Sequence, residues 1–299
     1  MTEENFRCGY VAIIGRPNVG KSTLLNHILG LKLSITSRKP QTTRHQILGV
    51  KTVDNGQLVF VDTPGIHSGG NRAINRYMNR AASSVIHDVD VVLFLVQSLK
   101  WTDEDQLVLN KLQQIDVPVV LVVNKVDKVA EKSQLLPFIS EISEKYKFAN
   151  VIPVSALQGD NLQQLEDYLL TLLPEKPPYF QDDEFTDRSL RFLAAEIIRE
   201  KLVRELGNEL PYQTTVEIER YKDEEKLTRI HALILVETKG QKVIVIGDKG
   251  AKLKSIGTKA RKDIEALIDR KVFLQLWVKV KAGWSDSEAS LRSLGYDAD

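Results

Sequence analysis

The feature that most constrains this chain is the octapeptide Gly15–Ser22 (GRPNVGKS), which matches the pattern G-x-x-x-x-G-K-[ST] at every fixed position. An apolar, β-branched run (residues 10–14) precedes it, and residues 22–29 carry apolar side chains at helical spacing. A glycine-rich loop between a strand and a helix can close its backbone amides around phosphate oxygens. We therefore interpret Gly15–Ser22 as a phosphate-binding loop, in which Lys21 reaches the β- and γ-phosphates and Ser22 ligates Mg²⁺.

The first half of the chain alternates between apolar runs and amphipathic stretches. Continuous β-branched runs suit parallel strands that are covered by helices on both faces, and Asn55-Gly56 indicates a hairpin. This alternation predicts an α/β doubly wound domain. The predicted strands are Cys8–Ile14, His45–Val53, Leu58–Val61, Val89–Val96, Val117–Val123 and Val151–Val154, and the predicted helices are Lys21–Leu29, Arg72–Ile86, Asp103–Gln114, Lys132–Tyr146 and Asn161–Leu173.

Polar motifs follow three of these strands, at the edge of the sheet where ligands bind in such folds. The first is Asp62-Thr63-Pro64-Gly65. The Asp62 carboxylate can hold Mg²⁺ through water, and the Gly65 amide can meet a γ-phosphate. Taken alone, a Pro-Gly turn explains this tetrapeptide equally well.

The second motif is Asn124-Lys125-Val126-Asp127. A carboxylate such as that of Asp127 can accept hydrogen bonds from N1–H and the 2-amino group of guanine together, whereas adenine offers no such pair of donors. Asn124 would brace the loop, and Lys125 would cover the base. The third motif, Ser155-Ala156-Leu157, would offer a backbone amide to the guanine oxygen. A solvated turn explains the second motif alone, but its place after the phosphate loop favours GTP.

The polar segment Thr36–Arg44 interrupts the apolar pattern between the first predicted helix and the hairpin. A segment in this position can order around the γ-phosphate and Mg²⁺ and loosen after hydrolysis. An ordinary surface loop is the alternative.

Together these motifs resemble, in order, the five motifs of translation-factor-class GTPases, with Gln41-Thr42-Thr43-Arg44 as the second of them. The resemblance implies that Thr43 joins Ser22 and Asp62 at Mg²⁺. Asn18 resembles an asparagine that coordinates potassium in some relatives; a turn-forming residue is the alternative. The implied catalytic residues are Lys21, Thr43 and Gly65. The implied GTP-binding residues are Gly15, Arg16, Pro17, Asn18, Val19, Gly20, Lys21, Ser22, Thr23, Thr42, Thr43, Asp62, Thr63, Pro64, Gly65, Ile66, Asn124, Lys125, Val126, Asp127, Ser155, Ala156 and Leu157.

Ile66 bears on the rate of hydrolysis. Many GTPases place a glutamine after the glycine of Asp-x-x-Gly to orient the attacking water. Isoleucine can neither donate nor accept a hydrogen bond. We therefore expect slow intrinsic hydrolysis that depends on a potassium ion, a repositioned residue or a partner, and no residue in this chain is assigned as a general base.

The proline-rich stretch 174–178 cannot continue a helix and indicates a stiff connector. We predict a nucleotide domain over residues 1–174, a linker over 175–187 and a second domain with a C-terminal tail over 188–299. The predicted elements of the second domain are the helices Arg188–Leu206 and Ala260–Ile268 and the strands Gln213–Tyr221, Ile230–Val236 and Val272–Val280.

The second domain contains a Gly-x-x-Gly loop (residues 247–250) within a basic region. Residues 239–281 carry 12 Lys and Arg against 4 Asp and Glu. The helix and strand after the loop are similar to those of a type II KH domain, an α+β fold whose loop clamps about four nucleotides. Pattern alone makes Val243–Ile246 a strand, whereas the KH resemblance implies a short helix there. The implied RNA-binding residues are Gly247, Asp248, Lys249, Gly250, Lys252, Lys254, Lys259, Arg261 and Lys262.

A GTPase domain followed by a KH domain resembles the Era family of bacterial GTPases over nearly the whole chain. Phe273–Trp284 and Leu291–Tyr296 are similar to that family's last strand and tail. The resemblance implies a monomeric factor that uses GTP, GDP and Mg²⁺, binds small-subunit ribosomal RNA near its 3′ end, and acts in assembly of the 30S subunit. It also implies a weak association with the inner membrane, which no residue here requires.

Composition bounds where such a protein works. The single cysteine, Cys8, excludes an internal disulfide and fits a reducing compartment. No apolar run reaches the roughly 18 residues of a membrane span, and the first residues lack a signal peptide's basic and apolar parts. We therefore expect a cytoplasmic protein, with the cytoplasmic face of the membrane as its other location.

Two functions from other classes remain open at this point. A non-catalytic scaffold that binds nucleotide structurally is supported by Ile66. A membrane-signalling GTPase would use the basic domain to meet anionic lipid. The Gly-x-x-Gly loop favours RNA over lipid, because attraction to lipid needs charge but no close backbone approach.

Overall fold

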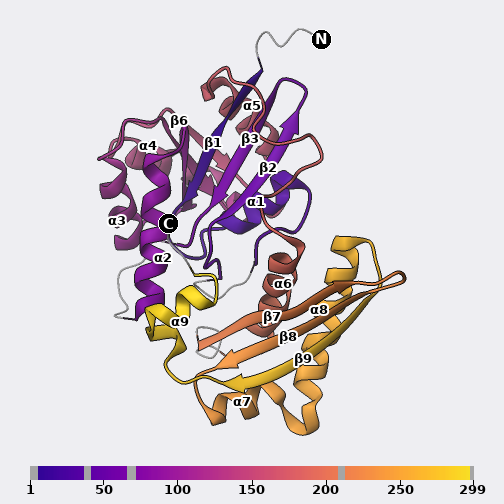
Figure 1. Cartoon of the computed structure of the whole chain (residues 1–299). Helices are drawn as coiled ribbons and strands as arrows, with labels where there is room; N and C mark the ends of the chain where they lie inside the picture. The colour runs from indigo at the N-terminus through magenta and orange to yellow at the C-terminus, as the bar shows by residue number, and fades with distance from the viewer. Residues whose placement is uncertain (1–5, 37–41, 66–71, 208–212, 297–299) are drawn as a thin grey trace. The chain divides into compact units, whose positions relative to one another are not determined.

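The computed structural model of the chain describes residues 6–36, 42–65, 72–207 and 213–296 (Figure 1). The chain divides into two compact units. The first contains the described residues of 1–34, 43–70 and 77–187. The second contains the described residues of 188–299 together with those of 35–42 and 71–76.

The first unit is built on a six-stranded sheet in the order β2-β3-β1-β4-β5-β6. Only β2 runs antiparallel to its neighbour, and it pairs with β3 across the two-residue turn Asp54-Asn55, so the predicted hairpin is confirmed. The inner strands are almost entirely buried, which explains their continuous apolar sequence. The strands are β1 (Arg7–Ile14), β2 (Ile47–Val53), β3 (Gly56–Asp62), β4 (Val91–Gln97), β5 (Val119–Asn124) and β6 (Asn150–Val154).

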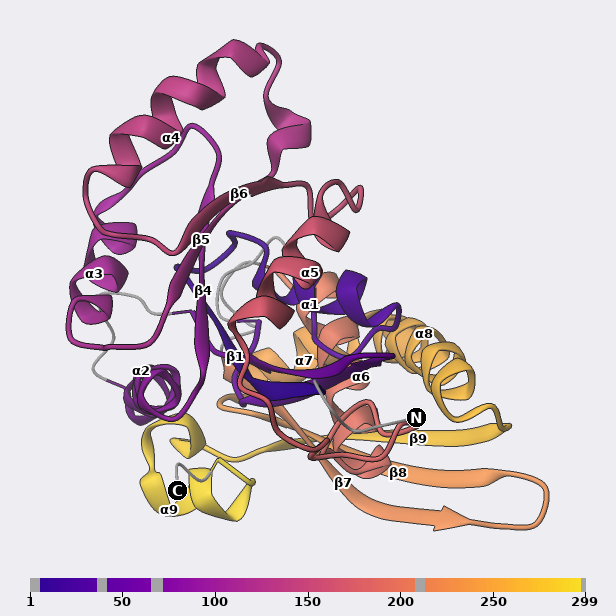
Figure 2. The ribbon, with the colours of Figure 1, turned by 90° about the horizontal axis from the view of Figure 1, so that it is seen from above.

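Helices cover both faces of this sheet, so the doubly wound prediction is confirmed (Figure 2). The predicted helix Lys132–Tyr146 is shorter than expected, because it opens with a 3₁₀ turn, Lys132–Gln134, before the α-helix begins. Pro137 sits in the first turn of that helix, where a missing N–H is tolerated. The helices are α1 (Lys21–Leu29), α2 (Ala73–Ser84), α3 (Asp103–Leu112), α4 (Leu135–Ser143) and α5 (Leu162–Leu172).

The second unit follows the order α-β-β-α-α-β of a type II KH domain. Its sheet has the order β7-β8-β9, with β7 antiparallel and β9 parallel to β8. One face of the sheet packs with α6 and α8 around a core that includes Ile198, Ile230 and Ile264. The elements are α6 (Leu190–Glu205), β7 (Thr214–Asp223), β8 (Thr228–Val236), α7 (Lys239–Ile246), α8 (Ala251–Ile268), β9 (Val272–Val280) and α9 (Glu288–Ser293).

The strand that pattern alone predicts at Val243–Ile246 is wrong, because these residues form the end of α7. A capping box starts this helix: the Thr238 hydroxyl accepts from the Gln241 amide, and the Gln241 side chain accepts from the Thr238 N–H. Val245 is buried while Val243 is 69% exposed, so the apolar run does not form a continuous buried strand. The predicted helix Ala260–Ile268 begins earlier, at Ala251, directly after Gly250.

Two aromatic residues of the tail close the second unit. Trp284 is fully buried and Tyr296 is 3% exposed, with ring centroids 6.4 Å apart. The Tyr296 hydroxyl is 2.9 Å from that of Thr215 on β7. Both rings therefore pack inside the second unit.

We expect Trp284→Ala to lower the free energy of unfolding by about 3–5 kcal/mol, because it removes a fully buried indole from a packed site. Urea unfolding followed by circular dichroism measures this loss. Trp277→Ala is the matched control, since Trp277 is 40% exposed and the same truncation there leaves no enclosed cavity. Equal losses for the two variants would contradict the packing role of Trp284.

Candidate nucleotide and RNA sites

The phosphate-binding loop joins the end of β1 to the start of α1, as its sequence predicts. Two of its glycines are required by close contacts. Gly15 has φ +151°, and a Cβ there would lie 2.5 Å from the Leu95 carbonyl oxygen. Gly20 has φ +111°, and its Cβ would lie 2.2 Å from Asn124 Nδ2. The loop can therefore keep this shape only with glycine at both positions.

Lys21 lies inside the loop that precedes it. Its Nζ donates to the carbonyl oxygens of Gly15 (3.0 Å) and Arg16 (3.1 Å). Burial lowers the pKa of Lys21 to about 8, although the nearby Asp62 carboxylate opposes this shift. A phosphate group beside this ammonium would favour its charged form.

Ser22, Thr43 and Asp62 come from three separate segments and meet beside the loop. The hydroxyls of Ser22 and Thr43 are 2.9 Å apart, and Asp62 Oδ2 accepts from Ser22 at 3.0 Å and from Thr43 at 3.3 Å. All three side chains are buried. The structure thus brings together the three residues that sequence analysis assigned to Mg²⁺.

The chemistry of this cluster fits a hard divalent cation. Burial raises the pKa of Asp62, although Lys21 and the hydroxyls of Ser34, Ser22 and Thr43 oppose the rise. Among the described residues, Asp62 Oδ1 has no hydrogen-bond partner of normal geometry, although it is buried. A cation would compensate this unpaired oxygen. No group of three or more His, Cys, Asp or Glu side chains in the described part of the chain is placed to hold a metal, so hydroxyls and phosphate oxygens would supply the remaining ligands.

Asn124 connects the loops that follow β5 and β6 to the phosphate-binding loop. Its Nδ2 donates to the Val19 carbonyl (2.8 Å), and its Oδ1 accepts from the amides of Lys125 (2.7 Å) and Ala156 (2.9 Å). One side chain therefore fixes the relative position of three of the predicted motifs.

Asp127 is exposed at the end of this loop and is oriented by Ser155, whose hydroxyl donates to Asp127 Oδ1 at 2.7 Å. Lys125 Nζ donates to the Asn18 carbonyl at 2.6 Å, and burial lowers its pKa to about 8. Leu157 is 64% exposed and does not belong to the hydrophobic core. The carboxylate of Asp127 thus faces solvent beside the fixed motifs, with one oxygen held by Ser155.

Of the remaining predicted residues, Gly65 lies against the loop and Thr63 contacts the end of β1. A Cβ on Gly65 would come within 2.8 Å of the Pro17 nitrogen, and the Thr63 hydroxyl donates to the Ile13 carbonyl at 3.0 Å. Ile66 and Gln41 lie outside the described residues.

The Arg16 side chain is held by an ion pair that the sequence motifs did not predict. Its Nε donates to Asp105 Oδ2 at 2.9 Å, in an ion pair whose side chains are 9% and 0% exposed. Asp105 also forms a capping box with Thr102 at the start of α3. A T-x-x-D sequence at 102–105 was visible as a helix start, but its pairing with Arg16 was not.

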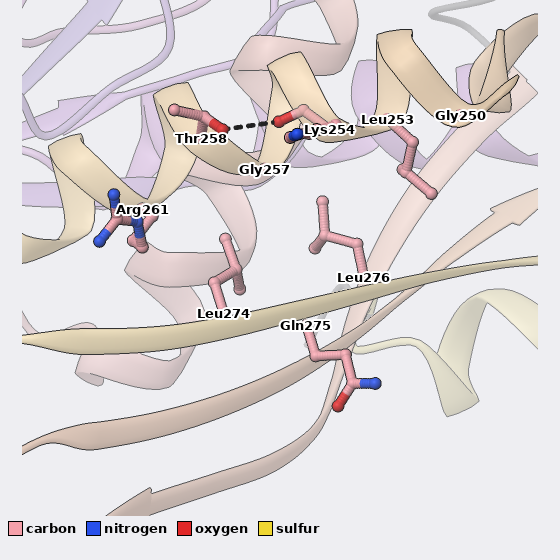
Figure 3. A pocket seen from close by; sticks show the side chains of 9 residues that line it. All are labelled: Gly250, Leu253, Lys254, Gly257, Thr258, Arg261, Leu274, Gln275 and Leu276. Carbon is pink, nitrogen blue, oxygen red and sulfur yellow. Dashed lines mark hydrogen bonds between the residues drawn. The ribbon is translucent and has the colours of Figure 1, made fainter. Parts of the chain in front are cut away.

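In the second unit, the Gly-x-x-Gly loop joins α7 to α8. Gly247 (φ +73°) and Gly250 (φ +80°) both have positive φ, and a Cβ on Gly247 would lie 2.6 Å from Lys252 Cβ. A groove of about 380 Å³ begins at Gly250 and runs between α8 and the edge strand β9 (Figure 3). Its lining residues are Gly250, Leu253, Lys254, Gly257, Thr258, Arg261, Leu274, Gln275 and Leu276.

The groove has an apolar floor that sequence analysis did not assign. Leu274 and Leu276 point from β9 towards α8, while Gln275 points to the opposite side of the strand (Figure 3). A Cβ on Gly257 would lie 3.3 Å from Leu276 Cδ1, so this glycine lets the helix approach the strand. The helical spacing 250, 253, 254, 257, 258 and 261 was the available signal.

The basic residues predicted for RNA divide between two faces of α8. Lys254 and Arg261 line the groove. Lys259 instead forms an ion pair with Glu205 of α6, which also accepts from Ser255. Lys252 and Lys262 are not among the groove residues.

Comparison with protein families separates the same two parts of the chain. A model described as 50S ribosome-binding GTPase matches residues 10–125, and a KH domain model matches residues 209–285. In the described part of the chain, no helix is long and apolar enough to cross a membrane.

Relatives and solved structures match the chain over its length. GTPase Era of Pseudomonas aeruginosa (strain LESB58) is 60% identical over 290 residues, covering 97% of this chain and 95% of the relative. GTPase Era of Pseudomonas fluorescens (strain Pf0-1) is 59% identical over 297 residues, covering 99% of each.

Two crystal structures align with a TM-score of 0.95 and 40% identity, each covering 98% of this chain and 100% of the other. They are a tyrosine-to-alanine variant of Aquifex aeolicus Era bound to GDP·AlF₄⁻, and Era in complex with MgGDPNP and nucleotides 1506–1542 of 16S ribosomal RNA. With a full-length identity of about 60% and both domain models in the expected order, this chain belongs to the Era family of GTPases.

Proposed function

We propose that this chain hydrolyses GTP to switch its binding of small-subunit ribosomal RNA near the 3′ end, as a factor in assembly of the 30S subunit. The observation that carries the GTPase half is the cluster of Ser22, Thr43 and Asp62 beside Lys21, with a buried carboxylate oxygen that lacks a hydrogen-bond partner among the described residues. We assign residues 1–174 to nucleotide hydrolysis and 188–299 to RNA, with 175–187 as the linker.

Each residue of the nucleotide site has a defined task in this proposal. Lys21 binds the β- and γ-phosphate oxygens, and Ser22, Thr43 and Asp62 hold Mg²⁺. When bound, Mg²⁺ neutralises the charge that the phosphate oxygens develop during transfer. The Gly65 backbone lies against Pro17 of the loop, and in this proposal its amide binds the γ-phosphate. These contacts position the phosphates, and no residue is assigned as a general base. Positioning and charge stabilisation are the main contributions of a protein to phosphoryl transfer.

Guanine selectivity rests on Asp127. The hydroxyl of Ser155 fixes one of its oxygens, and Asn124 fixes the loop in which it lies. The carboxylate can then accept from guanine N1–H and the 2-amino group. The Era relatives crystallised with GDP·AlF₄⁻ and with MgGDPNP support a guanine nucleotide as the ligand of this site.

The switch is supported by the segment that carries Thr43. Within the second unit, the buried Arg199 of α6 forms an ion pair with Glu196 and donates to the carbonyl oxygen of Thr42. Thr43, the next residue, contributes its hydroxyl to the Mg²⁺ cluster. Ordering of Thr43 by γ-phosphate and Mg²⁺ would therefore change the position of the Thr42 carbonyl that Arg199 binds.

We choose the ribosomal RNA from the relative that aligns with the whole chain, and not from the family model that matches only the nucleotide half. The model described as 50S ribosome-binding GTPase covers only residues 10–125, which lie in the nucleotide half. The Era structure with 16S ribosomal RNA, by contrast, aligns with 98% of this chain, including the KH domain. We therefore propose 16S rather than large-subunit RNA as the ligand of the groove.

The proposal places this protein in the cytoplasm and retains three features implied by the family resemblance. Asn18 would coordinate a potassium ion, and Ile66 would leave intrinsic hydrolysis slow. A weak, peripheral association with the inner membrane is the third implied feature, and comparing binding to anionic vesicles with binding to RNA measures it directly.

The test of the proposed function is GTP hydrolysis measured with and without RNA of 16S nucleotides 1506–1542, first in potassium and then in sodium. We expect the RNA to stimulate phosphate release, and potassium to support a higher rate than sodium. In the same samples, RNA affinity should differ between a GTP analogue and GDP, because only unequal affinities can shift a conformational equilibrium.

Two results would overturn the proposal. Equal RNA affinity with GTP analogue, GDP and no nucleotide would remove the switch. A rate near zero under every condition would leave the phosphate loop as a binding site and support the non-catalytic scaffold instead. Equal rates in potassium and sodium would remove only the role of Asn18.

A further inference from the structure

The groove between α8 and β9 uses only one face of the edge strand. Strict alternation along β9 places Leu274 and Leu276 towards α8 and leaves Phe273, Gln275 and Trp277 on the other face of the sheet. This outer face lies opposite the core helices (Figure 1). Phe273 is 44% and Trp277 40% exposed, although both are large apolar side chains. Large apolar side chains that are exposed together on one face are typical of a binding surface.

Four side chains of the outer face form one connected surface, which we call the aromatic platform: Arg229 and His231 of β8, and Phe273 and Trp277 of β9. The Arg229 guanidinium lies 4.8 Å from the Phe273 ring centroid. The His231 ring is 5.4 Å from that of Trp277 and 6.5 Å from that of Phe273, at interplanar angles of 73° and 65°. Each ring is therefore held in place by a neighbour while part of its surface stays exposed.

The arginine of the platform is fixed by a further contact. Glu224 accepts from Nε and Nη2 of Arg229, each at 3.3 Å, and these bonds lower the pKa of Glu224. A guanidinium held at its edge keeps a planar face for stacking, and Arg229 already lies over the Phe273 ring. This geometry suits a flat aromatic ligand better than an aliphatic one.

Charged side chains of both signs surround the platform. Register and alternation place Arg220 and Lys222 of β7, and Lys279 of β9, on the same face, and all three are exposed. The acidic residues there are Glu217 and Glu219 of β7, and Glu224, which pairs with Arg229. Exposed aromatic rings beside cations bind single-stranded nucleic acid, because bases stack on the rings and phosphates meet the cations.

Strand β9 links this platform to the groove. Gln275 lines the groove, yet it points to the outer side of the strand, between Phe273 and Trp277 in the alternation (Figure 3). A KH groove holds about four nucleotides. The RNA crystallised with an Era relative, nucleotides 1506–1542, is much longer than that. A strand that leaves the groove over the β9 edge would arrive directly at the platform.

We propose that the aromatic platform is a second RNA site, which stacks unpaired bases of the RNA strand that leaves the groove. This inference rests on the proposed RNA-binding function of the KH domain. Phe273 and Trp277 lie four residues apart on a strand, a span of about 13 Å, which leaves room for two or three bases.

The experiment measures binding of the full chain, with Mg²⁺ and a GTP analogue, to RNA of nucleotides 1506–1542. We expect Trp277→Ala to weaken binding by about 5- to 100-fold, the effect of losing one stacked base, and Trp277→Phe to retain most of the affinity. Leu136→Ala is the matched control for losing an exposed apolar side chain, since Leu136 is 74% exposed on α4, and its affinity should not change.

Fluorescence gives a second readout that a loss of folding would not imitate. Of the three tryptophans, Trp284 is fully buried and Trp101 is partly buried, so Trp277 is the exposed one. RNA should quench the emission of the unmodified protein, and this quenching should disappear in Trp277→Phe. Polyphosphate, which has charge but no bases, should bind Trp277→Ala and the unmodified protein equally.

The variant Lys254→Glu, at a residue that lines the groove, separates failure of this inference from failure of the proposed function. If it weakens RNA binding while Trp277→Ala and Phe273→Ala bind normally and quenching persists in Trp277→Phe, the groove binds RNA and the platform does not. That result would leave the platform to a protein partner and overturn the inference. If the unmodified protein does not bind the RNA at all, both the proposed function and the platform fail.

Discussion

Replacing Lys21 by alanine is expected to lower kcat/KM for GTP hydrolysis by about 100- to 1000-fold, the effect of removing one preorganised donor from a charged transition state. Lys21 is buried within the loop, and its ammonium donates to backbone carbonyl oxygens there. A γ-phosphate oxygen that gains charge during transfer would replace those acceptors, so the interaction strengthens as the reaction proceeds. Phosphate release measured over a range of GTP concentrations gives the change.

The matched control for this prediction is Lys111→Ala. Lys111 is also partly buried, its pKa is also lowered by burial, and its Nζ donates to Ser83 Oγ at 2.7 Å, outside every motif of the nucleotide site. Its removal should leave hydrolysis unchanged. Phosphate release by Lys21→Ala at the rate of the unmodified protein would mean that hydrolysis does not occur at this loop.

The nucleotide site could largely be predicted from sequence, because its residues lie at fixed spacing and at strand ends. Parallel strands bring their carboxyl ends to one edge of the sheet, so motifs after β1, β3, β5 and β6 must meet there. The hydrogen bonds of Asn124 to Val19 and Ala156 are a direct consequence of that topology. The order of the motifs along the chain was therefore sufficient to predict that their residues lie together.

Contacts that depend on side-chain packing between distant helices and loops could not be predicted in the same way. Asp105 starts α3, and its sequence signal is complete without any partner in space. Arg16 reaches it across 89 residues of sequence, and only the packing of α3 beside the loop brings the charges together. A sequence motif predicts where its own residues lie, whereas the contacts that support them depend on how other elements pack around it.

The segment before the Gly-x-x-Gly loop shows a conflict between two local signals. The β-branched run 243–246 favours a strand, while Thr238 and Gln241 form a capping box that favours a helix. The structure follows the cap, because an amphipathic helix buries Val245 and leaves Val243 exposed before the sharp turn at Gly247. Here the resemblance to a KH domain gave the correct element and propensity did not.

The aromatic platform could not be predicted from the composition of β9. Between Val272 and Trp277 every residue except Gln275 is apolar, so both faces carry apolar side chains, which is typical of a strand buried on both sides. In the structure only one face packs against helices, and Phe273 and Trp277 remain exposed. Hydrophobicity alone therefore could not separate the core side of this strand from a binding side.

We expect Asp127→Asn to weaken GTP binding by about 150- to 20,000-fold. The variant loses two charge-assisted hydrogen bonds to guanine, each worth about 1.5–3 kcal/mol. The same change should create affinity for xanthosine triphosphate. Xanthine carries a carbonyl oxygen where guanine has its 2-amino group, and an asparagine amide can donate to this oxygen while it accepts from N1–H. The ratio of kcat/KM for the two nucleotides, measured by phosphate release, reports the exchange.

The change of preference from GTP to xanthosine triphosphate tests recognition of the base separately from folding and from hydrolysis. Ser155 can donate to an asparagine oxygen at position 127 as it does to the carboxylate, so the loop should keep its position. Lys21, Ser22 and Asp62 are untouched, and the variant should therefore hydrolyse xanthosine triphosphate at a rate near that of the unmodified protein with GTP. Asp167→Asn on α5, which changes a carboxylate that accepts from Gln163 on its own helix, should leave GTP preferred. If Asp127→Asn still preferred GTP, the guanine base would have to be read by another group, and the backbone amide of Ala156 would become the first candidate.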